Sequence, residues 1–392
     1  MRKRALCILL MFILCLLPSC DSAEQDDDAP KNIADMYFVY YSNKINAETG
    51  NVTPLCTDPL CSHSDEDCQF VGVATDGYTG DRYGNKLIYT GHYWIKNDDP
   101  NSSLAMKAQN AIMSYDLLNN KVTIHLDLPS NGSYIMQYYN GNVLTQLMTA
   151  PDDIEKPKSE DYIRQLIIIN VEDHTLTEWP AVTFPPTTTI LDYTGEQIYY
   201  ADAALNYHVV DKKTGTDRMI DEAELSDAAM KSEYIYSRLV NVPEDENGVW
   251  KRFSDGSYRL IIPDAMDAKQ VGDLYVYPML NPEYNTEYGE ALYYQLDIWA
   301  CNLDGSEPRK IFENPGNIYI PYFFTHEAQA AGNHFGIPCL EVVFKEDGTR
   351  EILHDPNNGN ICSFFTLDTL TGEYKTVAVT KLGTGVQSYP AQ

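Results

Sequence analysis

One pattern recurs along this chain: a short run of aromatic or β-branched residues reaches Asp or Asn, and a tight turn follows. Gly and Asn supply the positive φ that such a turn needs, whereas β-branched residues resist it. The sequence therefore predicts a succession of antiparallel hairpins. Their turns lie at Thr49, Asn119, Asp173, Thr214, Asp255, Asp304, Asp347 and Thr371.

The spacing of these turns indicates the architecture. From Asn119 onward, consecutive turns are roughly 54, 41, 41, 49, 43 and 24 residues apart, and the middle values match the roughly 40–50 residues of a four-stranded propeller blade. The last spacing is too short for a blade, so the last two hairpins are expected to share one. Further strand-like segments precede most hairpins: Lys86–Tyr89, Asn142–Thr145, Gln197–Tyr200, Tyr234–Tyr236, Leu274–Tyr277 and Tyr319–Phe324.

The predicted fold is an all-β propeller of four-stranded antiparallel blades; seven blades fit best, and six or eight would also fit. A lone sheet with two apolar faces cannot bury both, but sheets stacked face to face around an axis can, and joining the last sheet to the first removes exposed ends. The 29 tyrosines suit such half-buried strands. Two sandwiches would show a central linker, and a β-helix would show shorter repeats. Only Asp221–Lys231 is predicted as a helix, crossing between blades.

The N-terminus has the layout of an export signal. Arg2, Lys3 and Arg4 precede an apolar run that ends at Leu17-Pro18-Ser19-Cys20, and this run is too short to span the ~30 Å core of a bilayer permanently. The layout resembles the bacterial lipoprotein signal, which implies cleavage before Cys20 and acylation of its thiol with chains such as palmitate. Two acyl chains anchor a protein firmly. The alternative is a secretory peptide with a chance cysteine.

The predicted organisation is a signal peptide over residues 1–19, the lipidated Cys20 with an acidic tether over 20–34, the propeller over 35–385 and a tail over 386–392. Cleavage removes three basic residues and changes the formal net charge from −29 to −32. Such a surface would repel phosphates, so nucleic acid is excluded as a partner. The expected location is the extracytoplasmic side of the cell membrane, with the lipid anchor as the membrane contact.

A cysteine-rich segment is the one chemical constellation. Cys56, Cys61, His63 and Cys68 have the spacing C-x4-C-x-H-x4-C, and three thiolates with one imidazole complete the tetrahedral shell of a structural Zn²⁺ site. Disulfides are an equal alternative outside the membrane, because the six non-lipidated mature cysteines make an even number. The further partners would then be Cys301, Cys339 and Cys362.

Taken with these residues, the body resembles the β-propeller lipoproteins of Gram-positive anaerobes, which are related in pattern to TolB-like and low-density-lipoprotein-receptor-like propeller repeats. The most specific shared segment is the L-C-x-D-P-L-C-x-H sequence ending at His63, followed by Cys68. The resemblance implies the fold and the location and brings no established chemistry.

The sequence holds no signature of a serine hydrolase, phosphate-binding loop, dinucleotide fold or zinc protease. The expected function is therefore that of a non-catalytic binding or scaffold module for a surface protein, peptide or glycan. The alternative is an extracellular glycan lyase or hydrolase with its site in the propeller mouth. Carboxylates and histidines converging on the axis would favour the enzyme, and an apolar funnel poor in histidine would favour the binding module.

Overall fold

The structure is a computed structural model, and it describes residues 33–40, 43–56, 80–97, 106–129, 132–149, 162–180, 182, 184, 188–202, 204–236, 247–265, 267–280, 287–288, 293–321, 328–346, 350–353 and 361–380. The chain divides into two compact units, residues 1–32 and 33–392, and the fold described below belongs to the second. The predicted signal peptide, Cys20 and the C-terminal tail lie outside the described residues. Within them, no helix is long and apolar enough to cross a membrane.

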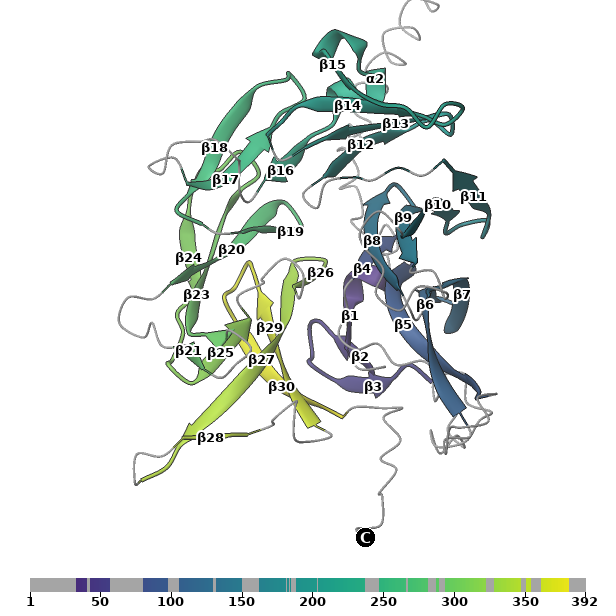
Figure 1. Cartoon of the computed structure of the whole chain (residues 1–392). Helices are drawn as coiled ribbons and strands as arrows, with labels where there is room; N and C mark the ends of the chain where they lie inside the picture. The colour runs from purple at the N-terminus through teal and green to yellow at the C-terminus, as the bar shows by residue number, and fades with distance from the viewer. Residues whose placement is uncertain are drawn as a thin grey trace, which may run out of the picture. The chain divides into compact units, whose positions relative to one another are not determined.

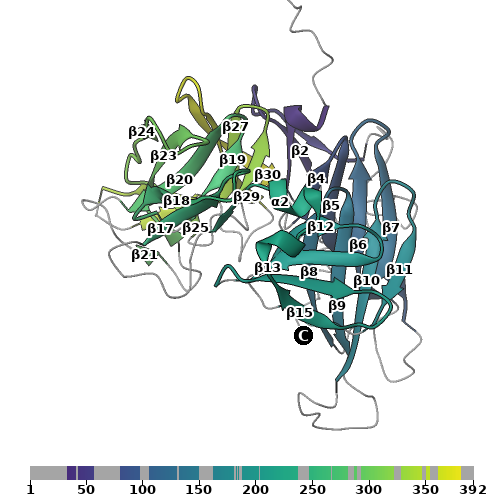
Figure 2. The same cartoon turned by 90° about the horizontal axis from the view of Figure 1, so that it is seen from above.

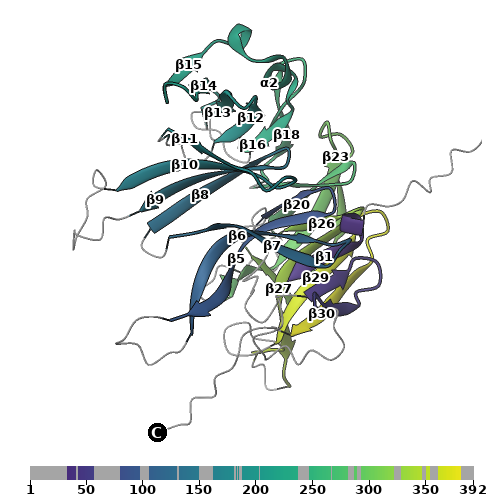
Figure 3. The ribbon, with the colours of Figure 1, turned by 90° about the vertical axis from the view of Figure 1, so that its right-hand side faces the viewer.

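Seven antiparallel sheets follow one another along the chain, which confirms the predicted seven-bladed β-propeller (Figure 1). The first strand of each blade lies toward the middle of the ring, where β8 contacts β12, β19 contacts β26, and β26 contacts β1. Blade two comprises β4 (Gly80–Tyr83), β5 (Lys86–Lys96), β6 (Met106–Asp116) and β7 (Lys121–Asp127). Blade three comprises β8 (Gly132–Tyr139), β9 (Asn142–Thr149), β10 (Ile163–Asn170) and β11 (Leu176–Trp179), with β8, β9 and β10 side by side in Figure 3.

Blades four, six and seven also have four strands in sequence order. Blade four comprises β12 (Thr189–Tyr193), β13 (Gln197–Ala201), β14 (Tyr207–Asp211) and β15 (Asp217–Ile220). Blade six comprises β19 (Lys269–Val271), β20 (Leu274–Leu280), β23 (Leu296–Asn302) and β24 (Arg309–Phe312). Blade seven comprises β26 (Gln329–Ala331), β27 (His334–Phe344), β29 (Ile361–Asp368) and β30 (Tyr374–Thr380).

Blades one and five have only three strands among the described residues. They comprise β1 (Tyr37–Tyr40), β2 (Asn43–Asn46) and β3 (Val52–Pro54), and β16 (Tyr234–Tyr236), β17 (Gly248–Arg252) and β18 (Tyr258–Pro263). In the four-stranded blades the recurrent turn joins the third strand to the fourth, whereas here it joins β2 to β3 and β17 to β18. Among the described residues, the strand that each of these two blades lacks is therefore the inner one.

The sheet of blade seven is enlarged to eight strands by four short additions: β21 (Glu287–Tyr288), β22 (Tyr293–Tyr294), β25 (Ile318–Pro321) and β28 (Arg350–Ile352). Because β27 pairs with both β28 and β29, the last two hairpins share one blade, as predicted. The segment Tyr319–Phe324 was expected as the strand preceding the blade-seven hairpin. Its described part belongs to β25, which pairs with the hairpin strand β27 and with β22, while β26 takes the inner position of the blade.

The predicted helix over 221–231 is present as two short pieces between blades four and five. A 3-10 turn, η2 (Glu222–Glu224), precedes α2 (Asp227–Lys231), and the Ser226 hydroxyl accepts the Ala229 amide to begin α2. The other 3-10 turn, η1 (Ile33–Met36), leads into β1. Figure 2 shows α2 beside β12, which it contacts.

Side chains at the ends of the third strands build the recurrent turns. The carboxylate of Asp116 accepts the amides of Leu118 and Asn119, and that of Asp368 accepts the amides of Leu370 and Thr371. Burial by itself raises the pKa of both aspartates, but these hydrogen bonds outweigh it and leave each pKa below its ordinary value. Equivalent bonds are made by Asn46, Asn170 and Asp211.

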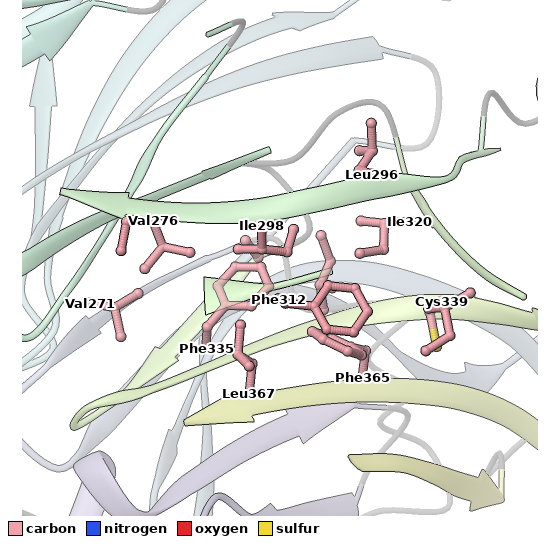
Figure 4. Packing of buried hydrophobic residues seen from close by; sticks show 14 of the residues in the cluster. Val271, Val276, Leu296, Ile298, Phe312, Ile320, Phe335, Cys339, Phe365 and Leu367 are labelled. Atoms are coloured by element: carbon pink, nitrogen blue, oxygen red, sulfur yellow. The ribbon is translucent and has the colours of Figure 1, made fainter. Parts of the chain in front are cut away.

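The hydrophobic core is divided into layers between neighbouring blades. Consecutive β10 residues show why: Ile168 packs between blades three and four, while Ile167 and Ile169 pack between blades two and three. Seven such layers close the ring, one at each interface between blades. Figure 4 shows the layer between blades six and seven, where the rings of Phe312 and Phe365 have centroids 4.8 Å apart.

Blades seven and one share no strand in the part of the chain that the structure describes, and side chains close the seam between them. The backbone N–H and C=O groups of Val39 point away from β2, toward the edge of β1 beside which no inner strand is described. The amide group of Gln329 on β26 fills this gap: its Oε1 accepts the Val39 amide at 3.0 Å, and its Nε2 donates to the Val39 carbonyl at 2.8 Å. On the same edge, the Arg82 guanidinium from β4 donates to the Tyr37 carbonyl. Neighbouring blades thus replace the missing strand with side chains.

Candidate functional site

The predicted metal segment begins at the end of blade one. Cys56 is half-buried and packs against the layer between blades one and two. The Tyr115 hydroxyl lies 3.4 Å from the Leu55 carbonyl and donates to Asn120 Oδ1 at 2.8 Å, which ties the start of the segment to blade two. Cys61, His63 and Cys68 lie outside the described residues. Within the described part of the chain, no three metal-binding side chains come together.

The described part of the chain contains four cysteines: Cys56, Cys301, Cys339 and Cys362. Three of them are buried in different layers: Cys301 between blades five and six, Cys339 between six and seven, and Cys362 between seven and one. Burial raises the pKa of the Cys301 thiol to about 11, with a smaller contribution from Asp304, and burial also raises the pKa of Cys339. These thiols are therefore protonated and act as small apolar core groups.

The middle of the ring is where propellers usually bind ligands, and the strands nearest to it are poor in groups for acid–base chemistry. Strands β1, β4, β8, β12, β16, β19 and β26 contain no histidine, and their only carboxylates are Asp81 and Asp192. They are instead rich in tyrosine. The tyrosines of these strands are Tyr37, Tyr40, Tyr83, Tyr134, Tyr138, Tyr139, Tyr193, Tyr234 and Tyr236.

Asp192 on β12 is buried and has a structural role. Its carboxylate accepts hydrogen bonds from the Tyr139 hydroxyl of blade three, the Tyr193 amide and the Ser226 hydroxyl that begins α2. The burial of Tyr139 and its contact with this carboxylate raise its pKa to about 12. Asp192 therefore joins blade three, blade four and the helical segment, and three of its roughly four acceptor positions are occupied.

Arg252 at the end of β17 is fully buried, with 0% of its surface exposed. Its guanidinium donates to the Tyr207 hydroxyl at 2.9 Å, the Met230 and Ser232 carbonyls at 2.9 Å and Glu222 Oε1 at 2.7 Å. These contacts fasten the helical segment to blade five. The arrangement satisfies a buried charge and leaves it with no group for a ligand.

His208 on β14 lies between two carboxylates. Its Nδ1 is 3.3 Å from Asp217 and its Nε2 is 3.6 Å from Asp202, while the Tyr200 ring stacks on it with centroids 4.7 Å apart. Asp202 also accepts the Asn206 amide, and Asp217 accepts the Tyr200 hydroxyl at 2.7 Å. This group is built into the outer half of blade four, away from the inner strand β12.

A further pair of titratable side chains, His125 and His174, was not predicted from the sequence. His174 was recognised only as a turn residue, and His125 lies 49 residues earlier in a different blade. No motif joins the two histidines, so only the stacking of blade two on blade three could reveal them.

Comparisons with known proteins find only distant structural similarity. No family model and no curated protein matches the chain. Solved structures that it resembles include a prolyl endopeptidase (10% identity, TM-score 0.38), of which the chain spans about half, covering 78% of this chain and 49% of that one. Others are the β-propeller domain of the Trilobed protease from Pyrococcus furiosus (9%, TM-score 0.35, covering 78% and 95%) and an oligogalacturonate lyase from Vibrio parahaemolyticus (9%, TM-score 0.31, covering 72% and 89%). Such low values carry no argument about activity.

Proposed function

We propose that this chain is a surface-anchored lipoprotein whose propeller is a non-catalytic binding or scaffold module for a protein, peptide or glycan. The N-terminal segment ending at Cys20 supports the anchor, and the strong negative charge favours cationic partners. Function in propellers resides in the loops and inner strands, while the stacked layers supply a rigid frame.

The observation that carries this proposal is the chemistry of the seven strands nearest the middle of the ring. They contain no histidine, and the buried carboxylate of Asp192 is committed to three hydrogen bonds. A glycosidase or lyase needs groups free to exchange protons or bind a metal, and these described strands supply few. Tyrosines suit a binding face because their rings provide contact area with little loss of side-chain entropy.

Two measurements separate the module from the alternative, a glycan lyase or hydrolase. Affinity electrophoresis of the full-length protein in gels containing purified cell-wall polysaccharides tests for retention, and an assay of new reducing ends and unsaturated sugars tests for turnover. Binding to surface glycans or surface proteins without any product is expected. Product formation that scales with protein concentration would overturn the proposal.

The anchor is tested by expression of the full chain in a bacterial host fed with labelled palmitate. The protein is expected to incorporate label and to sediment with membranes, and Cys20→Ala should abolish both. Cys15→Ala, inside the predicted signal peptide, is the matched control and should change neither. Labelling that persists in Cys20→Ala would contradict acylation at this residue.

For the cysteine segment, we propose that Cys56, Cys61, His63 and Cys68 bind one structural Zn²⁺. The segment contains three thiols and one imidazole, and Cys301, Cys339 and Cys362 are buried in three separate layers. An odd number of thiols cannot pair completely, whereas a Cys₃His site uses all three together with the imidazole.

Native mass spectrometry with and without a chelator tests the zinc site. A chelator-sensitive mass excess of one zinc is expected in the wild-type chain and in Cys301→Ala, and its loss is expected in Cys61→Ser. A deficit of two protons per cysteine pair without bound metal would establish bridges instead.

A further inference from the structure

Two histidines from different blades meet at the outer edge of the propeller. His125 is on β7, the outermost strand of blade two, and His174 is in the turn between β10 and β11 of blade three. Their Nδ1 atoms are 3.4 Å apart, and their rings have centroids 5.0 Å apart with planes inclined by 38°. His125 is half-buried and His174 is exposed, so solvent ions reach the pair.

The separation of the two nitrogens matches that of two ligands on one metal ion. Zn²⁺ binds imidazole nitrogen at about 2.0–2.1 Å in tetrahedral geometry, so two imidazoles on the same ion hold their nitrogens about 3.3–3.4 Å apart. The observed 3.4 Å meets this requirement without movement of either backbone. A hydrogen bond between the rings would be long at this distance.

The surroundings of His125 prepare its Nδ1 as a ligand. Nε2 lies 2.8 Å from the hydroxyl of Ser114 on the adjacent strand β6, and Ser114 is only 2% exposed. We assign the ring proton to Nε2, since it can then donate to this hydroxyl, and the lone pair on Nδ1 faces His174. Such a second hydrogen bond is what orients metal-binding histidines in proteins.

The charges around the pair are balanced. The nearest cation is Lys86, whose ammonium group donates to the Val171 carbonyl at 3.0 Å and pairs with Glu172 Oε2 at 3.1 Å. Glu172 and Asp173 precede His174 directly and bring two carboxylates to the same turn. Glu172 therefore offsets the positive charge of Lys86, and a divalent cation that binds the two histidines lies on a surface that also carries Asp173.

We propose that His125 and His174 bind one borderline divalent transition-metal ion, such as Zn²⁺ or Ni²⁺, through their Nδ1 atoms. Water molecules complete the shell, because only two protein ligands are present. The ion links the outer edges of blades two and three, where the chain itself makes no covalent connection. This site is separate from the cysteine segment and binds metal more weakly, since it has half as many protein ligands.

The backbone of His174 makes a clean variant available. Its φ of 62° lies in the left-handed region, which Asn tolerates better than other residues with a side chain. His174→Asn therefore removes the ligand and keeps the turn. His125→Asn removes the partner, and His334→Asn, at a half-buried histidine on β27, is the matched control.

Zn²⁺ titration of the full chain labelled with ¹⁵N-histidine tests the site, with resonances assigned from the variants. Two imidazole Nδ1 signals are expected to shift together, to lose this response in His125→Asn and in His174→Asn, and to keep it in His334→Asn. A response of His63 marks the cysteine segment and is expected to saturate at lower zinc. The proposal is overturned if millimolar zinc leaves both signals in place, or if either variant leaves the partner histidine responding as in the wild type.

Discussion

Replacement of Gln329 by Met tests how the ring closes. The side chain is 2% exposed and Val39 is 1% exposed, so no water can replace the amide that binds both backbone groups of Val39. Each buried group left without a partner costs about 1–3 kcal/mol, and the apolar Met side chain returns part of this. The expected loss of unfolding free energy is therefore about 3 kcal/mol.

The measurement is urea unfolding of the full chain followed by tryptophan fluorescence. Gln270→Met is the matched control: Gln270 lies on the inner strand β19, but its amide makes one exposed bond to the Gly272 carbonyl. This control should change stability by less than about 0.5 kcal/mol. Equal effects of the two substitutions would refute the assignment of Gln329 as the group that replaces the missing strand.

Gln329→Glu adds a test through pH. The glutamate keeps an acceptor for the Val39 amide, but when ionised it presents negative oxygen to the Val39 carbonyl, so burial and this contact raise its folded pKa. A group with a raised folded pKa stabilises fully below its unfolded pKa of about 4.3, and that contribution is lost as the pH rises. The free energy of unfolding of this variant should approach that of the wild type near pH 4 and fall well below it at pH 7. A difference in stability that does not change with pH would contradict the assignment of one accepting and one donating hydrogen bond from this side chain to Val39.

Three further outcomes are expected. Gly305→Ala should lower the free energy of unfolding in urea by about 1–3 kcal/mol more than Gly84→Ala. Both residues have positive φ, but a Cβ at Gly305 would lie 2.5 Å from a backbone carbonyl oxygen of β18, whereas a Cβ at Gly84 would have no atom within 4 Å. Equal losses would argue against close contact of blades five and six. Cys301 and Cys339 should resist iodoacetamide at pH 8 in the native protein and react after unfolding, as mapped by peptide mass spectrometry, and native labelling would show that their layers are open. Because the pKa of Asp368 is lowered in the folded state, its ionised carboxylate stabilises the fold above about pH 4, and this contribution is lost on acidification. Asp368→Asn keeps a hydrogen-bond acceptor that does not titrate, so Tm should fall less steeply between pH 4 and 2. An unchanged slope would contradict the role of Asp368 in the turn.

The turns made the blades predictable from the sequence because their chemistry is local. Asp368 and Thr371 belong to one hairpin, so the residues that determine the turn lie within four consecutive positions of the sequence. The β10 segment is similar. The consecutive residues Ile167, Ile168 and Ile169 indicate a strand with two buried faces, and this is confirmed because they pack into two different layers. Repetition of such local signals predicted the seven blades.

Contacts between blades left no such signal. Gln329 lies 290 residues from Val39. Nothing near Gln329 in the sequence shows that its side chain faces the edge of β1 opposite to β2. The sequence also did not reveal that blades one and five have no inner strand among the described residues, because turn spacing reports only the outer hairpins. His125 and His174 become neighbours only when two blades stack, so the pair could not be predicted without coordinates.

The seam has a consequence for how the chain reaches its native state. Where a propeller shares a strand between its two ends, the last strand must be inserted into a sheet that is otherwise complete. Among the described residues, blade one (β1–β3) and blade seven (β26–β30) exchange no strand, and the rings of Phe38 and Tyr40 contact the ring of Phe364 across the junction. Closure is thus a docking of two finished surfaces. The long-range step can come last, after six local assemblies, with little loop entropy left to lose.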